Sequence, residues 1–369
     1  MNNSKKRIVV YIRNKELNPS NYYRIHQYLR NIDIANFCYR ETSSNRIYYN
    51  YHFRGNILDR ILYALEIYVR AFIYTIIDNI NTPDCTIISR EVFPRRILLV
   101  QYFLEKRLTT LSKTIWDFDD SILEYGEISR KEWRLLENNA QMIITLNDYL
   151  KRKISERFQC KVLLLSTTDG DISVSLNRIE ERKKTYVNEV RLIWLGTASN
   201  IDNLQSIIPE LEKIKDRTNK KIILTCVCNR KVFSKSDNIL INNVLWSREA
   251  AIEELNNSHI GLMPLKNVVT NNGKGAFKII QYLCSSLPVV ASPIGMNKEV
   301  ITSKCGVLVN DDEWAQEIIK IAMDVDKWEK YSFESRKRWE KNYSYNRNLD
   351  FWLEKIENLF DKKYCGKKI

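Results

Sequence analysis

The chain of 369 residues lacks the patterns that mark a spanning membrane protein, a zinc site or a nucleic-acid-binding module. No run of about 18 uninterrupted apolar residues occurs, so no membrane-spanning helix is expected. The eight cysteines are scattered without paired CxxC spacing, and the start MNNSKKRIVVYIRN has no signal-peptide pattern, so we expect reduced thiols in a cytoplasmic protein. A zinc finger, an RNP-like aromatic strand and a long basic arm are all absent, which argues against nucleic acid as the partner.

The residues that are abundant indicate two globular cores and an anionic partner. Hydrophobic residues make up 44% of the chain, with 20 Tyr, 12 Phe and 8 Trp, which is enough for two domains of ordinary size. The formal net charge of +13 favours a partner such as a phosphorylated ligand or a lipid headgroup. Charge alone does not choose between these two.

Short apolar runs alternate with helical patterns in both halves of the chain, which predicts an α/β fold. In the first half, strands are predicted at 6–13, 85–90, 114–120, 141–147 and 161–166. In the second half, they are predicted at 190–196, 221–228, 243–247, 258–265, 287–292 and 305–309, followed by a helical tail. A charged connector at 176–189 separates the two series. The sequence therefore predicts one domain at 1–185, a second at 186–345, and a final helical segment at 346–369.

The stretch TNNGKGAFKIIQYLCSSLPVVASPIGMNKEV, residues 270–300, contains the clearest candidate site. A Gly- and Asn-rich turn leads into a short amphipathic helix, then into an apolar strand opened by proline. Amide groups that open a helix bind anions, and lysines add positive charge at the same end. The predicted phosphate site comprises Lys274, Gly275, Ala276, Phe277 and Lys278. The alternative, two lysines that are only solvated at a helix end, stays open.

A second part of this site is expected beyond the strand at 190–196. Gly196 and Thr197 follow its carboxyl end, and open α/β sheets bind ligands at that edge. A single loop glycine is also an ordinary turn residue, so this assignment depends on the neighbouring elements.

The second half of the chain resembles the nucleotide-sugar domain of retaining glycosyltransferases with the GT-B fold, of the family-4-like kind. The resemblance lies in VRLIWLGTASNIDNL, NVLWSREAAIEELNNSHIGLMPL and KGAFKIIQYLCSSLPVVASPIGMNKEVI, and covers roughly residues 187–345. In the first half, SNYYRIHQYLR and WDFDDSI resemble acceptor-domain segments of a polysaccharide-assembly branch. The resemblance implies two Rossmann-like, doubly wound domains that face a central cleft, with segment 346–369 packing back toward the N-terminal domain.

The sequence departs from the usual pattern of these enzymes at the donor site. Gly273 and Gln281 stand where the family has two glutamates seven residues apart, and GTASNIDN lacks the Arg and Lys that usually grip the diphosphate. Lys274, Lys278 and Arg248 are then expected to supply the positive charge. Gln281 remains a candidate donor contact.

Glu299 matches an acidic residue of the family in the turn beyond the signature strand. Two interpretations of it stay open, which are a contact to a ribose hydroxyl and a cap on the following residues.

The candidates in the first half are Asp117, Asp119, Arg24 and His26. The two carboxylates of WDFDD could orient the acceptor hydroxyl or accept its proton, or could only cap the next turn. A metal site at DFDD is not expected, because the resemblance is to enzymes without one. Arg24 is interpreted as an anion contact near the cleft. His26, one of three histidines, is a second cleft candidate, although a lone histidine on a helix is more often a structural residue.

The sequence as a whole predicts a metal-independent retaining glycosyltransferase that needs no cofactor. It would transfer a sugar from a nucleotide-sugar donor to a hydroxyl of a glycan or polyprenyl-linked glycan. Two alternatives stay open: a degenerate relative that binds a glycan or a partner protein, and a nucleotide-sugar epimerase.

Basic amphipathic segments at 56–77 and 93–113 could lie on an anionic membrane surface at the inner face of the plasma membrane. The alternative is that both segments pack on the first sheet.

Overall fold

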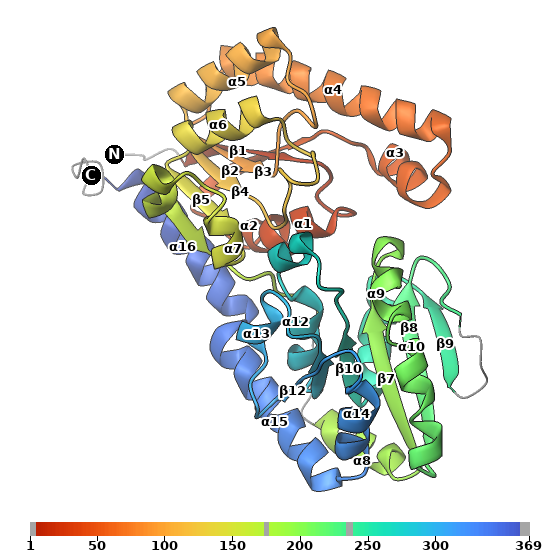
Figure 1. Cartoon of the computed structure of the whole chain (residues 1–369). Coiled ribbons are helices and arrows are strands. Elements are labelled where there is room, and N and C mark those ends of the chain that lie inside the picture. The colour runs from red at the N-terminus through yellow and green to blue at the C-terminus, as the bar shows by residue number, and fades with distance from the viewer. Residues whose placement is uncertain (1–4, 173–176, 234–238, 362–369) are drawn as a thin grey trace. The chain divides into compact units, whose positions relative to one another are not determined.

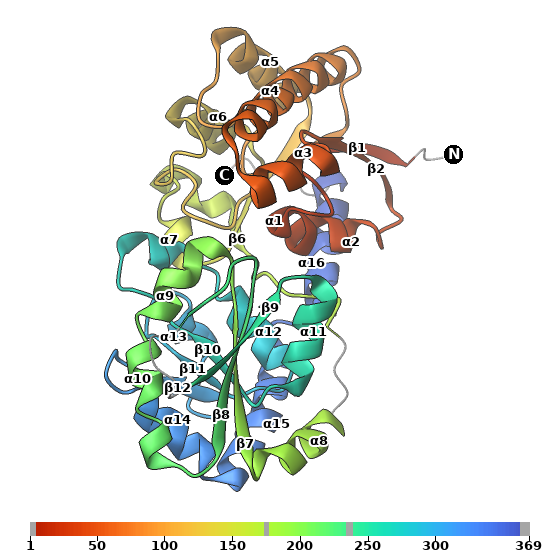
Figure 2. The same ribbon diagram turned by 90° about the vertical axis from the view of Figure 1, so that its right-hand side faces the viewer.

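The computed structural model describes residues 5–172, 177–233 and 239–361, and these form two compact units (Figures 1 and 2). The N-terminal unit comprises the chain up to Thr167 together with the segment from Asn346 on, and the C-terminal unit is Thr168–Tyr345. The boundary lies before the predicted position near residue 185. The reason is visible at Arg182, whose guanidinium donates to backbone carbonyls of the C-terminal unit, among them Leu255 and Ser285.

The N-terminal unit contains a six-stranded parallel sheet in the order β2-β1-β3-β4-β5-β6. Its strands are β1 (Lys6–Ile12), β2 (Ala35–Glu41), β3 (Cys85–Ser89), β4 (Lys113–Asp117), β5 (Met142–Thr145) and β6 (Val162–Leu164). All but β2 were predicted. The strand order reverses between β1 and β3, and in open α/β sheets ligands bind outside the carboxyl ends of strands at such a point.

The C-terminal unit contains a second six-stranded parallel sheet in the order β12-β11-β10-β7-β8-β9. Its strands are β7 (Glu189–Leu195), β8 (Lys221–Cys228), β9 (Leu240–Leu245), β10 (Ile260–Met263), β11 (Val289–Ala291) and β12 (Gly306–Leu308). Each overlaps a predicted strand. The first strand of this unit, β7, lies between β8 and β10, so the order reverses between β7 and β10.

Helices connect the strands of each sheet. In the N-terminal unit they are α1 (Pro19–Asn21), η1 (Tyr22–His26), α2 (Gln27–Leu29), α3 (Asn45–Tyr49), η2 (Asn50–Arg54), α4 (Ile57–Ile80), α5 (Leu99–Leu111), α6 (Arg130–Asn139), α7 (Asp148–Lys151), η3 (Glu156–Lys161) and α16 (Tyr345–Phe360). In the C-terminal unit they are α8 (Asn177–Tyr186), η4 (Ala198–Asn200), α9 (Ile201–Gln205), α10 (Ile208–Glu212), η5 (Lys215–Arg217), α11 (Arg248–Asn257), η6 (Val269–Gly273), α12 (Phe277–Cys284), α13 (Asn297–Val300), α14 (Trp314–Ala322) and α15 (Val325–Asn342). The predicted helical tail is present as α14, α15 and α16.

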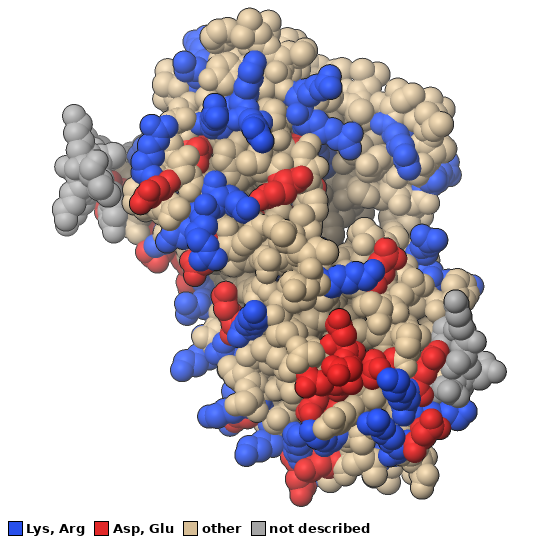
Figure 3. All heavy atoms as spheres, in the orientation of Figure 1, with Lys and Arg blue, Asp and Glu red and all other residues tan. Residues whose placement is uncertain are grey.

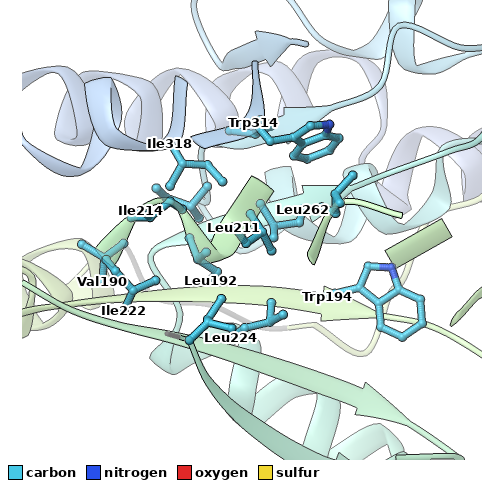
Figure 4. Close-up of a cluster of buried hydrophobic side chains, with 14 of the residues drawn as sticks. Val190, Leu192, Trp194, Leu211, Ile214, Ile222, Leu224, Leu262, Trp314 and Ile318 are labelled. Carbon is cyan, nitrogen blue, oxygen red and sulfur yellow. The ribbon is translucent and has the colours of Figure 1, made fainter. Parts of the chain in front are cut away.

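The sheet of the C-terminal unit is buried on both faces, which explains its continuous apolar runs. On one face, Leu192 and Trp194 of β7 pack in a cluster with Leu211 of α10 and Trp314 of α14 (Figure 4). On the other face, apolar side chains of α11 and α12 form a second cluster. These two clusters fix the carboxyl ends of β7 and β10 beside the start of α12.

Two buried side chains of α16 form hydrogen bonds with the rest of the N-terminal unit. The indole of Trp352 donates to the carbonyl of Arg24 at 2.9 Å. The amide of Asn348 donates to Tyr28 Oη at 3.1 Å and to the carbonyl of Ser166 at 2.7 Å. Among the described residues, no helix has the length and apolarity required to cross a bilayer.

The N-terminal unit orients α4 through one fully buried carboxylate. Asp78 accepts hydrogen bonds from Arg7 at 2.9 Å, from Arg40 at 2.6 and 2.8 Å, and from the hydroxyl of Tyr11 at 2.9 Å. Arg7 and Tyr11 lie on β1, and Arg40 lies on β2. The carboxylate therefore links the carboxyl-terminal end of α4 to two strands of the sheet.

Replacing Asp78 by Ala should destabilise the protein strongly, because both arginines would lose their buried counter-charge. Removal of one partner of a buried ion pair costs about 3–5 kcal/mol, so the free energy of unfolding in urea should fall by that amount. Asp33→Ala is the matched control, since Asp33 is 97% exposed in its pair with Lys5 and such pairs contribute little. Equal effects of the two substitutions would contradict the assignment.

Candidate functional site

Gly196 follows the carboxyl end of β7 at a position where a side chain would collide with a neighbouring ring. The amide of Gly196 donates to the carbonyl of Val227 on β8 at 3.0 Å. A Cβ atom at Gly196 would lie 2.1 Å from the indole ring of Trp194, which is fully buried. The ring of Trp194 thus lies directly against the turn, at the edge where the strand order reverses.

Lys278, on the first turn of α12, lies over this indole ring. Its ammonium nitrogen is 5.0 Å from the ring centroid of Trp194, within the range of a cation–π contact. Burial and the neighbouring Lys274 ammonium together lower the pKa of Lys278 to about 7. An anion bound beside Lys278 would favour its charged form and raise this pKa. The sequence predicted Lys278 but not the ring beneath it.

The turn before α12 has an unusual backbone conformation. Ala276 caps the helix with φ 52°, a left-handed conformation that is costly for a residue with a side chain. Lys274 precedes this cap, and its amide donates to the carbonyl of Asn271 at 3.2 Å. Gly295 also has φ 52°, and a Cβ atom there would lie 3.0 Å from the same carbonyl. The loop after β11 therefore supports the loop before α12.

Gln281 has a partner that the sequence did not indicate. Its amide nitrogen donates to Asp169 Oδ2 at 2.8 Å, and both side chains are buried. Asp169 lies in the segment that enters the C-terminal unit, far from Gln281 in the chain. No local pattern or spacing marks this contact, so only the structure could reveal it. A carboxylate thus lies beside the position where the resemblance expects a glutamate.

The other candidates of the C-terminal unit lie on three further elements. Thr197 follows Gly196, and its hydroxyl interacts with the hydroxyl of Ser199 at 2.9 Å. Arg248 is the first residue of α11, directly after the cap residue Ser247. Glu299 is exposed on α13, and its carbonyl accepts a hydrogen bond from Arg338 at 2.7 Å.

In the N-terminal unit, the structure brings Arg24 and Asp117 together in a buried ion pair. The guanidinium donates to both carboxylate oxygens, with nitrogen–oxygen distances of 2.6 to 3.2 Å. Arg24 also donates to the carbonyl of Leu165 at 2.9 Å and to Thr167 Oγ1 at 3.0 Å. Burial raises the pKa of Asp117 although the cation opposes this effect. Asp117 therefore holds Arg24 in place at the end of β4.

Asp119 belongs to a neighbouring set of contacts. It accepts hydrogen bonds from Arg90 at 2.9 Å and from the hydroxyl of Ser20 at 2.5 Å. Burial alone would raise its pKa, but Arg90, Arg24 and these hydrogen bonds outweigh burial and lower it. Asp119 is thus an ionised carboxylate near the carboxyl ends of β3 and β4.

His26 has different partners from Arg24, although both lie on η1. Its Nδ1 is 3.1 Å from the hydroxyl of Tyr39, and its Nε2 is 3.2 Å from a carboxylate oxygen of Glu16. Burial lowers the pKa of His26, so the neutral ring is favoured. Both ring nitrogens are occupied, as expected for a structural histidine.

The lowered pKa of Lys278 can be measured by competitive labelling with acetic anhydride across a pH series. We expect the labelling of Lys278 to reach half its maximum near pH 7, whereas an ordinary lysine does so near pH 10.4. Mass spectrometry of the peptide 274–284 would resolve it, and Lys337, on the exposed side of α15, serves as the reference. A labelling midpoint for Lys278 close to that of Lys337 would contradict the buried environment described above.

Comparison with known proteins finds a family match over part of the chain and a fold shared by the whole chain. Residues 189–324 match the family described as Glycosyl transferases group 1. That range contains Gly196, Lys274, Lys278 and Gln281, and extends from β7 into α14. No curated protein matches the sequence of the chain.

Solved structures resemble the whole chain at low sequence identity. Sucrose-phosphate synthase from Thermosynechococcus elongatus is 12% identical, with 96% of this chain and 99% of that chain covered and a TM-score of 0.66. HepE from Anabaena, in complex with UDP-glucose, is 10% identical, with 95% and 99% covered and a TM-score of 0.64. A putative UDP-N-acetylglucosamine 2-epimerase from Listeria monocytogenes is also 10% identical, with 97% of each chain covered and a TM-score of 0.58.

At such identities the likeness establishes the fold and leaves the activity open. The two units each contain six parallel strands, and two Rossmann-like domains are the arrangement that the resemblance implied. The chain therefore has the GT-B fold, and its C-terminal unit carries the match to group 1 glycosyl transferases.

Proposed function

We propose that the protein is a retaining glycosyltransferase that moves a sugar from a nucleotide-sugar donor to a hydroxyl of a glycan or polyprenyl-linked glycan. The process it would serve is the synthesis of a cell-surface polysaccharide or glycoconjugate. The observation that carries the proposal is the ammonium of Lys278 against Trp194, at the carboxyl end of β7 and the start of α12. This cation lies where the strand order of the sheet reverses, within the residues that match group 1 glycosyl transferases. Both facts support a donor diphosphate as its ligand.

The donor site is proposed to divide into a phosphate part and a sugar part. The phosphate part consists of Lys274, Gly275, Ala276, Phe277 and Lys278, with Arg248 as a further cation. The remaining donor contacts are proposed to be Gly196, Thr197, Gln281 and Glu299. Helix α12 begins directly after the left-handed turn at Ala276, and the amide groups at the start of a helix favour an anion there.

In the proposed reaction, the acceptor oxygen bonds to the anomeric carbon as the bond from that carbon to the diphosphate breaks. The bonding electrons pass to the leaving phosphate oxygen, so negative charge develops on the diphosphate. Lys278 and the amides that open α12 stabilise this charge. The proton of the acceptor hydroxyl passes to the departing diphosphate, which is itself a base, so no glutamate of the signature is required for the step.

Asp119 and Asp117 are proposed to serve the acceptor in different ways. Asp119 is ionised and could orient the acceptor hydroxyl, whereas Asp117 acts through Arg24, from which it accepts three hydrogen bonds. Arg24 is proposed as an anion contact, and His26 as a support for the same helical segment. We place the enzyme in the cytoplasm, at the inner face of the plasma membrane, where a polyprenyl-linked acceptor would be found.

Two observations would also fit other functions. The amide of Gln281 in place of a carboxylate would suit a degenerate relative that binds a glycan or a partner protein without transfer. The likeness to the Listeria epimerase would suit an enzyme that changes the configuration of the donor sugar itself. An epimerase would convert a nucleotide sugar without an acceptor and without releasing the nucleoside diphosphate.

The proposal is tested by release of nucleoside diphosphate from UDP-, GDP- and dTDP-sugars, with and without a polyprenyl-linked acceptor. Slow hydrolysis of one donor and faster release with acceptor are expected. EDTA should leave the rate nearly unchanged, because the protein's own cations stabilise the leaving charge. Glycan binding without any release would favour the degenerate relative, and strict dependence on Mg²⁺ or Mn²⁺ would contradict the proposed phosphate site.

Lys278→Gln and Lys274→Gln should each weaken binding of the nucleoside diphosphate. Each loses a charge-assisted contact of about 1.5–3 kcal/mol, which corresponds to roughly tenfold or more in the dissociation constant measured by calorimetry. Lys337→Gln, on the exposed side of α15, is the matched control.

The pH dependence of binding should identify Lys278 specifically. The anion raises the pKa of Lys278 above its value of about 7 in the free protein, so binding takes up protons. Affinity should be greatest below pH 7 and fall as the pH rises through the higher pKa of the complex. In Lys278→Gln this proton uptake should vanish, whereas uptake that persists in the variant would assign the coupling to another group.

A further inference from the structure

Helix α4 presents a long apolar stripe to solvent, while its inward side is mixed and buries Ile67 and Ala71 beside several polar side chains. Facing inward are Asp59, Thr75, Asp78 and Asn79, all buried, and Glu66, whose side chain is 11% exposed. Facing outward over the full length of the helix are Ile57, Leu58, Ile61, Leu62, Leu65, Val69, Ile73, Ile76, Ile77 and Ile80, which are 36 to 82% exposed. An ordinary surface helix instead turns its apolar stripe toward the core of the protein.

Specific contacts hold α4 in this orientation. Asp78 is tied to Arg7 and Arg40, as described above. Near the other end, Glu66 accepts hydrogen bonds from the amide of Ser44 at 3.1 Å and from the hydroxyl of Ser43 at 3.2 Å. A rotation of α4 that buried its apolar side would break both sets of contacts and expose carboxylates that are now paired.

Helix α5 repeats the arrangement beside α4. Gln101, Glu105 and Thr109 are buried on its inner side. The outward apolar residues of this segment are 56 to 68% exposed, and they are Leu98, which precedes α5, and Leu99, Val100, Phe103 and Leu111 on α5. The two helices are adjacent, since the amide of Asn79 on α4 donates to the carbonyl of Leu104 on α5 at 3.0 Å. Their outward sides form one surface, which we call the α4–α5 face.

The exposed charged side chains on α4, on α5 and just before α5 are all basic. Arg60 on α4, Lys106 and Arg107 on α5, and Arg95 and Arg96 before α5 are all exposed. The acidic residues of the two helices are Asp59, Glu66, Asp78 and Glu105, and each is buried or half-buried. Figure 3 shows blue and tan spheres over the part of the surface that α4 and α5 form.

We infer that the α4–α5 face docks on an anionic lipid bilayer, with its apolar side chains in the headgroup region and its arginines and lysines on lipid phosphates. Exposed apolar patches of this extent mark interaction sites, and a basic rim is complementary to anionic lipid. A second copy of the chain is the poorer occupant, because the same face on two molecules would bring positive charge against positive charge. No described helix can span a bilayer, so the interaction is one of surface docking.

This inference rests on the membrane location given in the proposed function and names the surface that would contact the membrane. Its test does not involve the donor site. Cosedimentation with vesicles of phosphatidylcholine alone and of phosphatidylcholine mixed with phosphatidylglycerol measures lipid binding directly. The wild-type protein should bind the mixed vesicles at least tenfold more tightly, and added salt should weaken the binding. Nucleoside diphosphate binding by the same samples reports on the donor site separately.

Two variants separate the apolar part from the charged part. Leu65→Ser with Ile73→Ser removes two outward side chains of α4, and Lys106→Glu with Arg107→Glu reverses two charges on α5. Each should weaken vesicle binding roughly tenfold or more, with thermal unfolding close to that of the wild type because these side chains are exposed. Val187→Ser with Leu245→Ser is the matched control, since both residues are at least 65% exposed in the C-terminal unit.

The outcomes decide between occupants. Loss of binding in the α4 and α5 variants, with the control unaffected, supports the inference. Equal binding of neutral and mixed vesicles, or unchanged binding in both variants, would overturn it. Concentration-dependent dimers in light scattering that the Leu65→Ser, Ile73→Ser variant abolishes would assign the face to a second copy, and would likewise overturn the lipid assignment.

Discussion

The contact between Lys278 and the indole ring of Trp194 is the interaction on which the candidate site depends. It joins the start of α12 to the carboxyl end of β7, and it requires glycine at position 196, because any side chain there would meet the ring. The ammonium of Lys278 is partly buried and lies near that of Lys274, so its pKa is lowered to about 7. A site built in this way is completed by an anion, which is why a diphosphate is the ligand we propose.

The absence of the usual glutamates has a physical counterpart in the structure. Gln281, which stands in place of one glutamate, donates a hydrogen bond from its amide to the buried carboxyl group of Asp169. A carboxyl group is therefore kept near α12, but on a different segment and already hydrogen-bonded to an amide. In the proposed transfer the leaving diphosphate acts as the base, so the protein mainly positions groups and stabilises charge.

Most strands and the lysine-rich turn followed from the sequence because local pattern determines them. The run 221–228 is mostly apolar because most of β8 is buried, whereas β2 was not predicted because it is an edge strand of mostly half-buried residues. Trp194 beneath Lys278 and Asp169 beside Gln281 could not be predicted, because each pairs residues far apart in the chain. The apolar stripe of α4 was visible, but its outward orientation is set by Asp78 and its distant arginines.

The central claim is that the C-terminal unit binds an intact nucleotide sugar through the positive charge at the start of α12. A thermal-shift screen of UDP, GDP, dTDP and their common sugars tests this most directly, because only ligands that bind the folded protein raise its melting temperature. We predict that one nucleotide series stabilises the protein, that the intact donor is at least as effective as its diphosphate, and that Lys278→Gln loses most of the shift. No shift with any nucleotide or nucleotide sugar, in a protein that is folded and still binds lipid vesicles, would contradict the claim.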